Sequence, residues 1–521
     1  MCDSTLFFGG NIITMEGDCP ESVLVEDGVV RRTGRSCGQK GARPFDLKGA
    51  TLLPAFIDSH SHITALAQTL GLAPLEKARC FGDIAAALRS FAQENPSVSW
   101  ISGFGYDHNF LKEKAHPTRQ VLDKAVGDRP CVIAHASGHM GVANTAALRI
   151  LGITQSTPDP DGGRIGREPD GQPSGYLEET AFTSASIPRP GLEEQFRLME
   201  KAQQVYLRYG ITTVQDGYTR KPEWQLLKAM ADSGRLTVDT VCYPDCSELF
   251  DLPDYCAAYA GGYHNRLRIG GYKIFLDGSP QGRTAWMSQP YLGAEKEYYG
   301  YPIYDDDQVT AFMEQALQTG RQLLAHCNGD AAAQQMIDAY ARALQTTGKP
   351  GVRPVMIHAQ LVRPDQLQRM AQLGMMASFF VAHTYYWGDI HLQNFGPQRA
   401  MRISPAKTAL RAGVRFTLHQ DSPVLPPDML NTVWCAVNRV TRQGAALSQE
   451  ECLTPYEALR AVTLDAAYQY GEEERKGSIR PGKLADFVVL DQNPLQTDPQ
   501  AIKDIQVLCT IKEGRILYEK A

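Results

Sequence analysis

The stretch RQLLAHCNGDAAAQQMIDAYARALQTTGKPGVRPVMIHAQL, residues 321–361, predicts a strand, a helix and a second strand. Its two ends, RQLLAHC and PVMIHAQL, are short apolar runs of the length typical of buried strands. The segment between them places apolar residues at helical spacing and ends on Gly348. A strand–helix–strand unit of this kind indicates two parallel strands joined by a crossover helix.

The same alternation continues on both sides of this stretch. Further strand-like runs are GITTVQD (210–216), RIGGYKIFLDG (268–278), MMASFFVAH (375–383) and VRFTLHQD (414–421). Repeated strand–helix units predict a parallel sheet, and this number of them in one domain favours a closed (β/α)₈ TIM barrel over an open sheet. We therefore expect an α/β protein with a barrel over about residues 56–465.

Three regions depart from this rhythm. Residues 1–55 and 466–521 contain short strands separated by turn residues, which predicts one small composite β-sandwich domain built from both ends of the chain. Residues from about 65 to 190 are rich in Gly and Pro toward their end. We interpret them as an insertion after the first barrel strand, folded over the barrel mouth.

Composition limits the possible partners. A net charge of -6 gives no broad positive field, so we expect a small-molecule substrate and neither nucleic acid nor a membrane surface as partner. The 12 Cys are scattered without a CxxC pair, which argues against thiolate zinc sites and disulfides. The first residues, MCDSTLFFGG, lack a basic segment before an apolar run, so the expected location is cytoplasmic.

The segment PAFIDSHSH contains the first candidate metal ligands. Alternation along a strand would project His60 and His62 to the same side, where two imidazoles can share one cation. Alone, this HxH pattern is weak. Four more candidates lie at the C-terminal ends of predicted strands, where barrel enzymes assemble their sites: Lys273, His326, His358 and Asp421. Nitrogen and carboxylate ligands without thiolates suit zinc or another divalent first-row ion with an open position for water.

The order HxH, Lys, His, His, Asp resembles the amidohydrolase superfamily of metal-dependent barrel hydrolases. Motifs such as GGNIITM, SGHMGVANTAAL, KIFLDGSPQGRTAW and HQDSPVLPPD are similar to the branch that contains N-substituted formamide deformylase. The resemblance implies that His60 and His62 bind the more buried metal, with Asp421 close to it. It places His326 and His358 on the outer side of the site.

The resemblance also places Lys273 where related enzymes carry a lysine carboxylated on its ε-nitrogen, which bridges two metals. Burial can lower a lysine's pKa and so make its neutral amine available to CO₂. Unmodified Lys273 could equally neutralise Asp277 or a substrate carboxylate. One metal and two metals both stay open, and a homodimer is a family-level expectation.

These residues permit a specific hydrolysis. A divalent ion lowers the pKa of water from 15.7 toward about 7 and polarises a carbonyl. Asp421 would accept the proton of the water and pass it to the leaving nitrogen, and a neutral His358 would help to stabilise the oxyanion. We expect hydrolysis of a non-peptide C–N bond of amide, N-acyl or N-formyl type. The alternatives are a deaminase, a cyclic amide or ester hydrolase, and a metal-binding protein without turnover, which the intact Asp421 disfavours.

The candidate substrate contacts lie in later loops and in the insertion: His139, Arg283, Trp286, His383 and Trp387. Aromatic and polar groups together suit a pocket that stacks a ring and fixes polar atoms. The alternative is that Tyr385, Tyr386 and Trp387 simply pack the barrel rim.

Overall fold

The computed structural model describes residues 4–38, 40–96, 98–108, 110–135, 140–160, 163–183, 185, 190–294 and 297–520. The chain forms two compact units, one from Met1–Leu66 with Met199–Ala521 and one from Ala67–Leu198. Together their elements make a mixed α/β fold. His139 lies outside the described residues.

Parallel strands form the centre of the first unit. One sheet has the order β16-β15-β14-β7, with β7 (Phe56–Ile57), β14 (Ile211–Thr219), β15 (Asp239–Pro244) and β16 (Leu267–Ile269). A second has the order β17-β18-β19-β20-β21, with β17 (Gly271–Phe275), β18 (Gln322–Cys327), β19 (Val355–His358), β20 (Met376–Phe379) and β21 (Phe416–Leu418). A parallel bridge between Asp245 and Lys273 joins β15 to β17. The carboxyl ends of all these strands therefore lie on the same side.

Helices alternate with these strands. They are α6 (Leu192–Arg208), α7 (Lys221–Asp232), α8 (Leu252–Tyr255), α9 (Ala257–Ala260), α10 (Asp306–Thr319), α11 (Asp330–Thr347), α12 (Pro364–Leu373), α13 (His383–Tyr386), α14 (Gly388–Ala400), α15 (Ala406–Arg411), α16 (Met429–Asn438), α17 (Pro455–Ala461) and α18 (Leu464–Gln469). Gly348 ends α11 in a left-handed conformation with φ 61°, which glycine adopts without strain. The strand, helix and strand predicted within 321–361 are confirmed as β18, α11 and β19.

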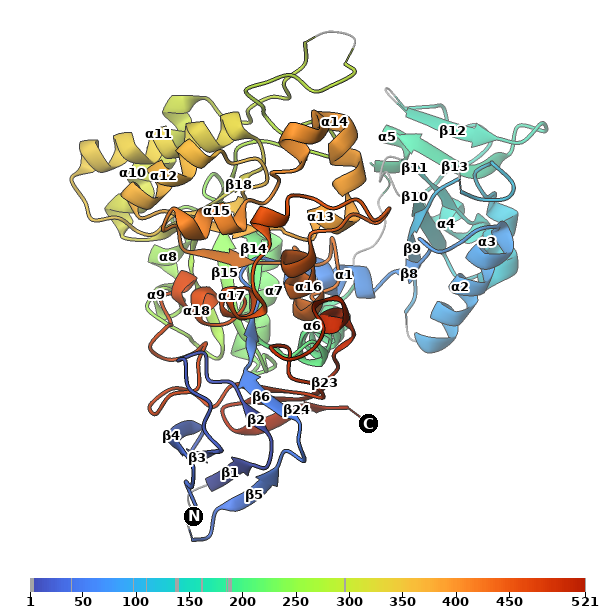
Figure 1. The fold of residues 1–521 in the computed structure, drawn as a ribbon. Coiled ribbons are helices and arrows are strands. Elements are labelled where there is room, and N and C mark those ends of the chain that lie inside the picture. The colour runs from blue at the N-terminus through green and yellow to red at the C-terminus, as the bar shows by residue number, and fades with distance from the viewer. Residues whose placement is uncertain are drawn as a thin grey trace. The chain divides into compact units, whose positions relative to one another are not determined.

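Strands from the two ends of the chain share one sheet, in which blue and red ribbons lie side by side in Figure 1. Its order is β2-β6-β22-β23-β24, with β2 (Asn11–Ile12), β6 (Thr51–Pro54), β22 (Phe487–Leu490), β23 (Val507–Lys512) and β24 (Arg515–Glu519). A second sheet contains β1 (Ser4–Phe8), β3 (Ser22–Glu26), β4 (Val29–Gly34) and β5 (Arg43–Asp46). Phe7, Val23, Leu52, Phe487 and Ile511 belong to one buried apolar cluster, which joins the two sheets.

A buried charge network ties the strands of this first unit together. The carboxylate Oδ2 of Asp239, at the start of β15, lies 2.6 Å from Lys476 Nζ and 2.8 Å from Lys512 Nζ. All three side chains are almost completely buried. Burial alone would raise the pKa of Asp239, but the two ammonium groups outweigh it and hold this pKa well below its usual range.

The second unit has its own mixed sheet, in the order β12-β13-β11-β10-β9-β8. Its strands are β8 (Ala73–Pro74), β9 (Ile101–Tyr106), β10 (Cys131–His135), β11 (Met140–Ala143), β12 (Gly163–Arg167) and β13 (Pro173–Glu179). Its helices are α2 (Phe81–Glu94), α3 (Arg119–Val126), α4 (Thr145–Ile150) and α5 (Thr180–Thr183), and α1 (Ile63–Leu70) leads into it. Ile84, Leu88, Tyr106, Leu122 and Ile133 help to form its separate core.

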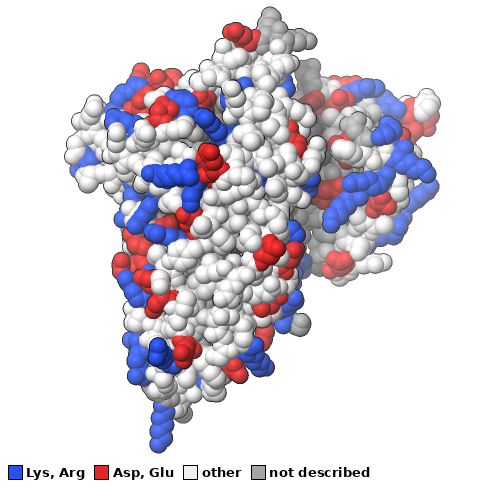
Figure 2. Space-filling model, viewed as in Figure 1, with Lys and Arg blue, Asp and Glu red and all other residues white. Residues whose placement is uncertain are grey.

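On the face shown in Figure 2, Lys and Arg lie beside Asp and Glu toward the edges, and other residues cover much of the middle. Within the described part of the chain, the helices are too short or too polar to cross a membrane. The described cysteines are all free, and most of them are buried, as their scattered spacing predicts.

Candidate metal centre

His60 and His62 come together with Asp421 as their pattern predicts, but not on a strand. β7 already ends at Ile57, because the chain turns there to enter α1. The strand argument for their common side is therefore wrong, although their rings do lie 5.2 Å apart. His62 Nε2 lies 3.3 Å and His60 Nε2 lies 3.6 Å from Asp421 Oδ1.

These three ligand atoms fit a cation. They lie within 4.8 Å of one another. Ligands at 2.0–2.1 Å from a tetrahedral zinc stand about 3.3–3.4 Å apart, close to the two distances from Asp421 Oδ1. That oxygen is buried without a hydrogen-bond partner among the described residues. A buried acceptor of this kind is costly unless something else satisfies it, and a bound cation would do so.

Lys273 lies beside this group on β17. It is completely buried, and its Nζ lies 3.3 Å from His60 Nε2. Burial lowers the pKa of Lys273 to about 7, although the nearby charge of Asp421 opposes the shift. Among the described contacts, Asp277 accepts hydrogen bonds from the backbone N–H groups of Trp286, Asn328 and Gly329 and none from Lys273. The structure therefore gives no support to the pairing of Lys273 with Asp277.

His326 and His358 lie at the carboxyl ends of β18 and β19. His326 Nδ1 lies 3.2 Å from His358 Nε2, and His358 Nε2 lies 3.9 Å from Asp421 Oδ2. Burial lowers the pKa of His326 to about 4 and that of His358 well below its usual value, so both rings are neutral at physiological pH. The six candidate ligands thus lie in one group, although Lys273 lies in the middle of β17 and not at its carboxyl end as predicted.

The backbone at two of these positions is strained. His358 has φ 72° and Asp421 has φ 56°, both in the left-handed region that side chains other than glycine rarely adopt. Such strain persists where the surrounding structure holds it, and it concentrates at functional sites. Burial opposes ionisation of Asp421, but the neighbouring imidazoles of His62, His358 and His60 hold its pKa well below the usual value.

Gln215 on β14 orients His60 and was missed by the sequence analysis. Its side-chain NH₂ donates to the carbonyl of Ser59 at 2.8 Å, so its Oε1 faces His60 Nδ1 at 2.6 Å. His60 therefore carries its proton on Nδ1 and presents the Nε2 lone pair to Lys273 and Asp421. Gly217 leaves room for the ring, since a Cβ there would lie 2.5 Å from His60 Cε1.

His419, just beyond β21, was also missed. Its Nε2 lies 3.1 Å from His358 Nδ1, and its Nδ1 lies 2.7 Å from Ser378 Oγ. The signal in the sequence was its spacing, two residues before Asp421 in LHQD, which repeats the spacing of the HxH pair. His419 can fix the tautomer of His358 as Gln215 fixes that of His60.

The predicted substrate contacts are placed unevenly around this group. The ring of Phe380 lies 5.9 Å from that of His358 and 4.7 Å from that of His383. The rings of His383 and Trp387 lie 4.5 Å apart. Arg283 Nε donates to Asn394 Oδ1 at 2.9 Å, and Trp286 is half-buried beside Asp277, to which its backbone N–H donates.

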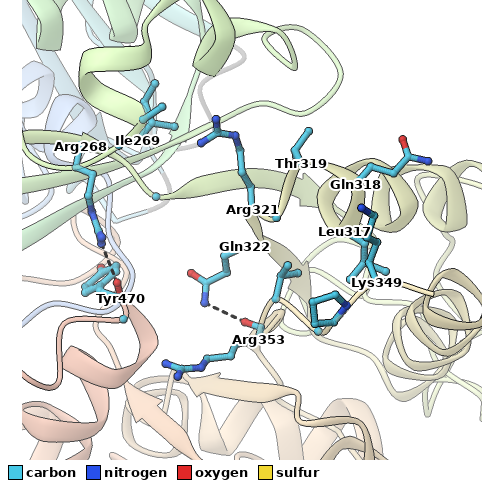
Figure 3. Close-up of a pocket in the computed structure, with 18 of the residues that line it drawn as sticks. Arg268, Ile269, Leu317, Gln318, Thr319, Arg321, Gln322, Lys349, Arg353 and Tyr470 are labelled. Atoms are coloured by element: carbon cyan, nitrogen blue, oxygen red, sulfur yellow. Dashed lines mark hydrogen bonds between the residues drawn. The ribbon is translucent and has the colours of Figure 1, made fainter. Parts of the chain in front are cut away.

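A cavity of about 750 Å³, shown in Figure 3, is separate from this group. Arg268, Gln322 and Arg353 line it at the amino ends of the parallel strands. His326 and His358 lie at the opposite ends of the same strands. Because barrel enzymes react at the carboxyl ends, this cavity is not the predicted active site.

Comparisons with known proteins agree on one family. A profile described as the amidohydrolase family matches residues 43–518. The N-substituted formamide deformylase of Arthrobacter pascens is 28% identical over 542 residues, covering 99% of this chain and 98% of the relative. An imidazolonepropionase of Acinetobacter baumannii is 27% identical over 135 residues, 26% of this chain and 29% of the relative.

A solved structure extends the likeness to the fold. The crystal structure of an uncharacterized metal-dependent hydrolase from Pyrococcus furiosus has a TM-score of 0.78 and 25% identity. It covers 95% of this chain and 100% of its own. With the family profile and the deformylase spanning nearly the whole chain, this protein belongs to the amidohydrolase family and is an enzyme that acts on C–N bonds.

Proposed function

We propose that this enzyme hydrolyses a non-peptide C–N bond of amide, N-acyl or N-formyl type in a small molecule, with water activated by a divalent metal. The observation that carries the proposal is the grouping of His60, His62, Lys273, His326, His358 and Asp421. The relative named N-substituted formamide deformylase supports the bond type. The exact substrate is a separate question.

The proposed metal ligands are His60, His62 and Asp421 for a first ion, with His326 and His358 facing a second. Zinc suits this set of imidazole and carboxylate donors without thiolates. The two parallel sheets, which follow one another in chain order, support a (β/α)₈ barrel over 56–465. The sheet shared by both chain ends supports the composite β-sandwich domain of 1–55 and 466–521. The insertion over the barrel mouth, the homodimer and the cytoplasmic location stay predictions.

Lys273 is the proposed bridge between two ions. Its neutral amine would attack CO₂, form an N–C bond and release one proton, which leaves a carbamate anion with two oxygen ligands. A pKa of about 7 keeps a large share of this amine neutral at physiological pH. The carbamate would also remove the cost of burying an ammonium group beside imidazoles.

In the proposed mechanism a divalent cation would lower the pKa of the attacking water and polarise the substrate carbonyl. Asp421, held ionised, accepts a proton from the attacking water on its carboxylate. It then returns this proton to the leaving nitrogen as the C–N bond breaks. His358 is neutral and can either bind the cation through Nε2 or donate to the developing oxyanion, and the tautomer set by His419 decides between them.

Metal analysis followed by a hydrolysis screen tests the proposal. We expect stoichiometric zinc or a similar ion, and acid release from N-acyl or N-formyl amines that stops when a chelator removes the metal. His264→Ala, at an exposed histidine away from the group, serves as the control for a lost imidazole. Purified protein without bound metal after incubation with Zn²⁺ would overturn the proposal.

Deamination of a ring amine, or hydrolysis of a cyclic amide or ester, is the second candidate. The rings of Phe380, His383 and Trp387, packed beside the site, favour it because they suit a planar substrate. Ammonia release in the same screen would identify a deaminase, whereas opening of a cyclic substrate releases no second product.

A further inference from the structure

A second group of metal-type ligands lies in the unit Ala67–Leu198, outside the site described above. Asp107 and His108 directly follow β9, and His135 is the last residue of β10. β9 and β10 are parallel neighbours, so these side chains leave the same edge of the sheet. The carboxyl edge of parallel strands is where α/β sheets bind their ligands.

The backbone redirects His135 toward the other two residues. The register of the β9–β10 pair shifts between Ala134 and His135, which places His135 opposite Tyr106. Bulges of this kind re-aim a side chain and are common beside functional sites. As a result His135 Nε2 lies 3.3 Å from His108 Nδ1.

The distances among the three residues match a coordination sphere. Asp107 Oδ1 lies 3.5 Å from His135 Nε2 and 3.8 Å from His108 Nδ1. Ligands around a tetrahedral zinc stand about 3.3–3.4 Å apart, close to the spacing of the two imidazole nitrogens and to the shorter distance from Asp107. The His60, His62 and Asp421 group has similar spacings. The three ligand atoms lie within 4.8 Å of one another, as the ligands of one cation do.

Neighbouring rings support these ligands. The ring of His116 lies 4.2 Å from that of His108, and its Nδ1 lies 3.1 Å from the hydroxyl of the fully buried Tyr106. The side chains of Asp107 and His108 are 26% and 30% exposed, so an ion can enter from solvent.

We propose that Asp107, His108 and His135 form a second divalent-metal site, independent of the barrel residues, which binds Zn²⁺ through two imidazoles and one carboxylate. Three protein ligands leave one tetrahedral position open, as in sites that exchange water or a substrate group. The ring of His116 packs against that of His108, and the ring of Tyr106 lies 5.4 Å from that of His135.

Cobalt binding to the full-length protein tests this site, with the barrel ligands removed by His60→Ala and His62→Ala. We expect this variant to bind about one equivalent of Co²⁺ with the visible absorption of a tetrahedral ion. Adding His108→Ala and His135→Ala should weaken binding by at least about 100-fold. Adding His264→Ala instead, at an exposed histidine of the other unit, should leave binding unchanged.

Two further measurements keep the test decisive if the combined variants fold poorly. Asp107→Asn preserves shape and should weaken Co²⁺ binding by about 10–100-fold without changing the thermal unfolding of the metal-free protein. In the otherwise native chain, His108→Ala with His135→Ala should lower the zinc content by about one equivalent. The proposal fails if the variant without His60 and His62 binds no Co²⁺. It also fails if Co²⁺ binding and zinc content stay unchanged when Asp107, His108 and His135 are replaced. Either result would show a hydrogen-bonded cluster without a metal.

Discussion

Asp421→Asn removes the carboxylate that the imidazoles face and keeps the shape of the side chain. Asp421 Oδ1 lies 3.3 Å from His62 Nε2, and Oδ2 lies 3.9 Å from His358 Nε2. The amide oxygen of Asn can still face a cation, but it cannot accept the proton of a water molecule. General-base catalysis contributes about 10²–10⁴-fold in rate, which corresponds to about 2.7–5.4 kcal/mol of activation free energy.

We expect the upper part of this range, because both HxH rings face this one carboxylate. The assay measures formate release from an N-substituted formamide at saturating Zn²⁺, together with the metal content of the same sample. kcat should fall about 1,000-fold or more while the metal remains bound. Asp338→Asn, on the exposed face of α11, is the matched control.

A variant that retains its metal and loses less than about tenfold in kcat would refute the role of Asp421 as the base. Loss of the metal together with activity would show that Asp421 acts mainly as a metal ligand and would leave its role as base without support. If kcat falls while the metal stays bound, the variant has lost proton transfer and not metal binding.

Three further results are expected. Gln215→Leu removes the acceptor that fixes the tautomer of His60 and should weaken Zn²⁺ binding by about 10–100-fold, as measured by competition with a chromophoric chelator. At constant CO₂ pressure, the ¹³C signal of a Lys273 carbamate should grow with an initial rate about tenfold higher one pH unit above its pKa of about 7 than one unit below, because only the neutral amine reacts. Equal initial rates at both pH values would contradict this. Asp239→Asn leaves two buried ammonium groups without their shared carboxylate and should lower the free energy of unfolding in urea by about 3–5 kcal/mol at neutral pH. Since the folded pKa of Asp239 is depressed, its stabilisation is complete above about pH 4 and is lost as the pH falls further, so the gap between variant and wild type should narrow in acid.

The parallel strands and the grouping of the candidate ligands could be predicted from the sequence because their patterns are local. Apolar runs such as LLAHC carry a candidate histidine near their end, and the order of the runs gives the order of the strands. His60 and His62 were found for a partly wrong reason, since the chain leaves the strand at Ile57. Their convergence depends on contacts with β14 and with residues around Asp421, which are far away in sequence.

The groups that orient these ligands could not be predicted in the same way. Gln215 lies inside a strand whose sequence predicts only buried core. Its role appears only from its contact with His60, which is 155 residues away in the sequence. The region of about 65–190 lacks the strand–helix rhythm of the first unit because it folds around a sheet of its own with antiparallel neighbours. His108 and His135 therefore looked isolated, although a bulge brings their rings together.

The sheet that joins both ends of the chain has a consequence for folding during synthesis. β6 pairs with β22 between Pro54 and Phe487, and β22 pairs in turn with β23. A growing chain cannot complete this sheet until nearly all of the protein has left the ribosome. Strand pairs this distant in sequence form slowly. Until they form, the exposed apolar edges of the strands are prone to aggregate. The last few dozen residues lie far from the reacting groups. They should nevertheless affect how much the chain depends on chaperones and how much recombinant enzyme is obtained.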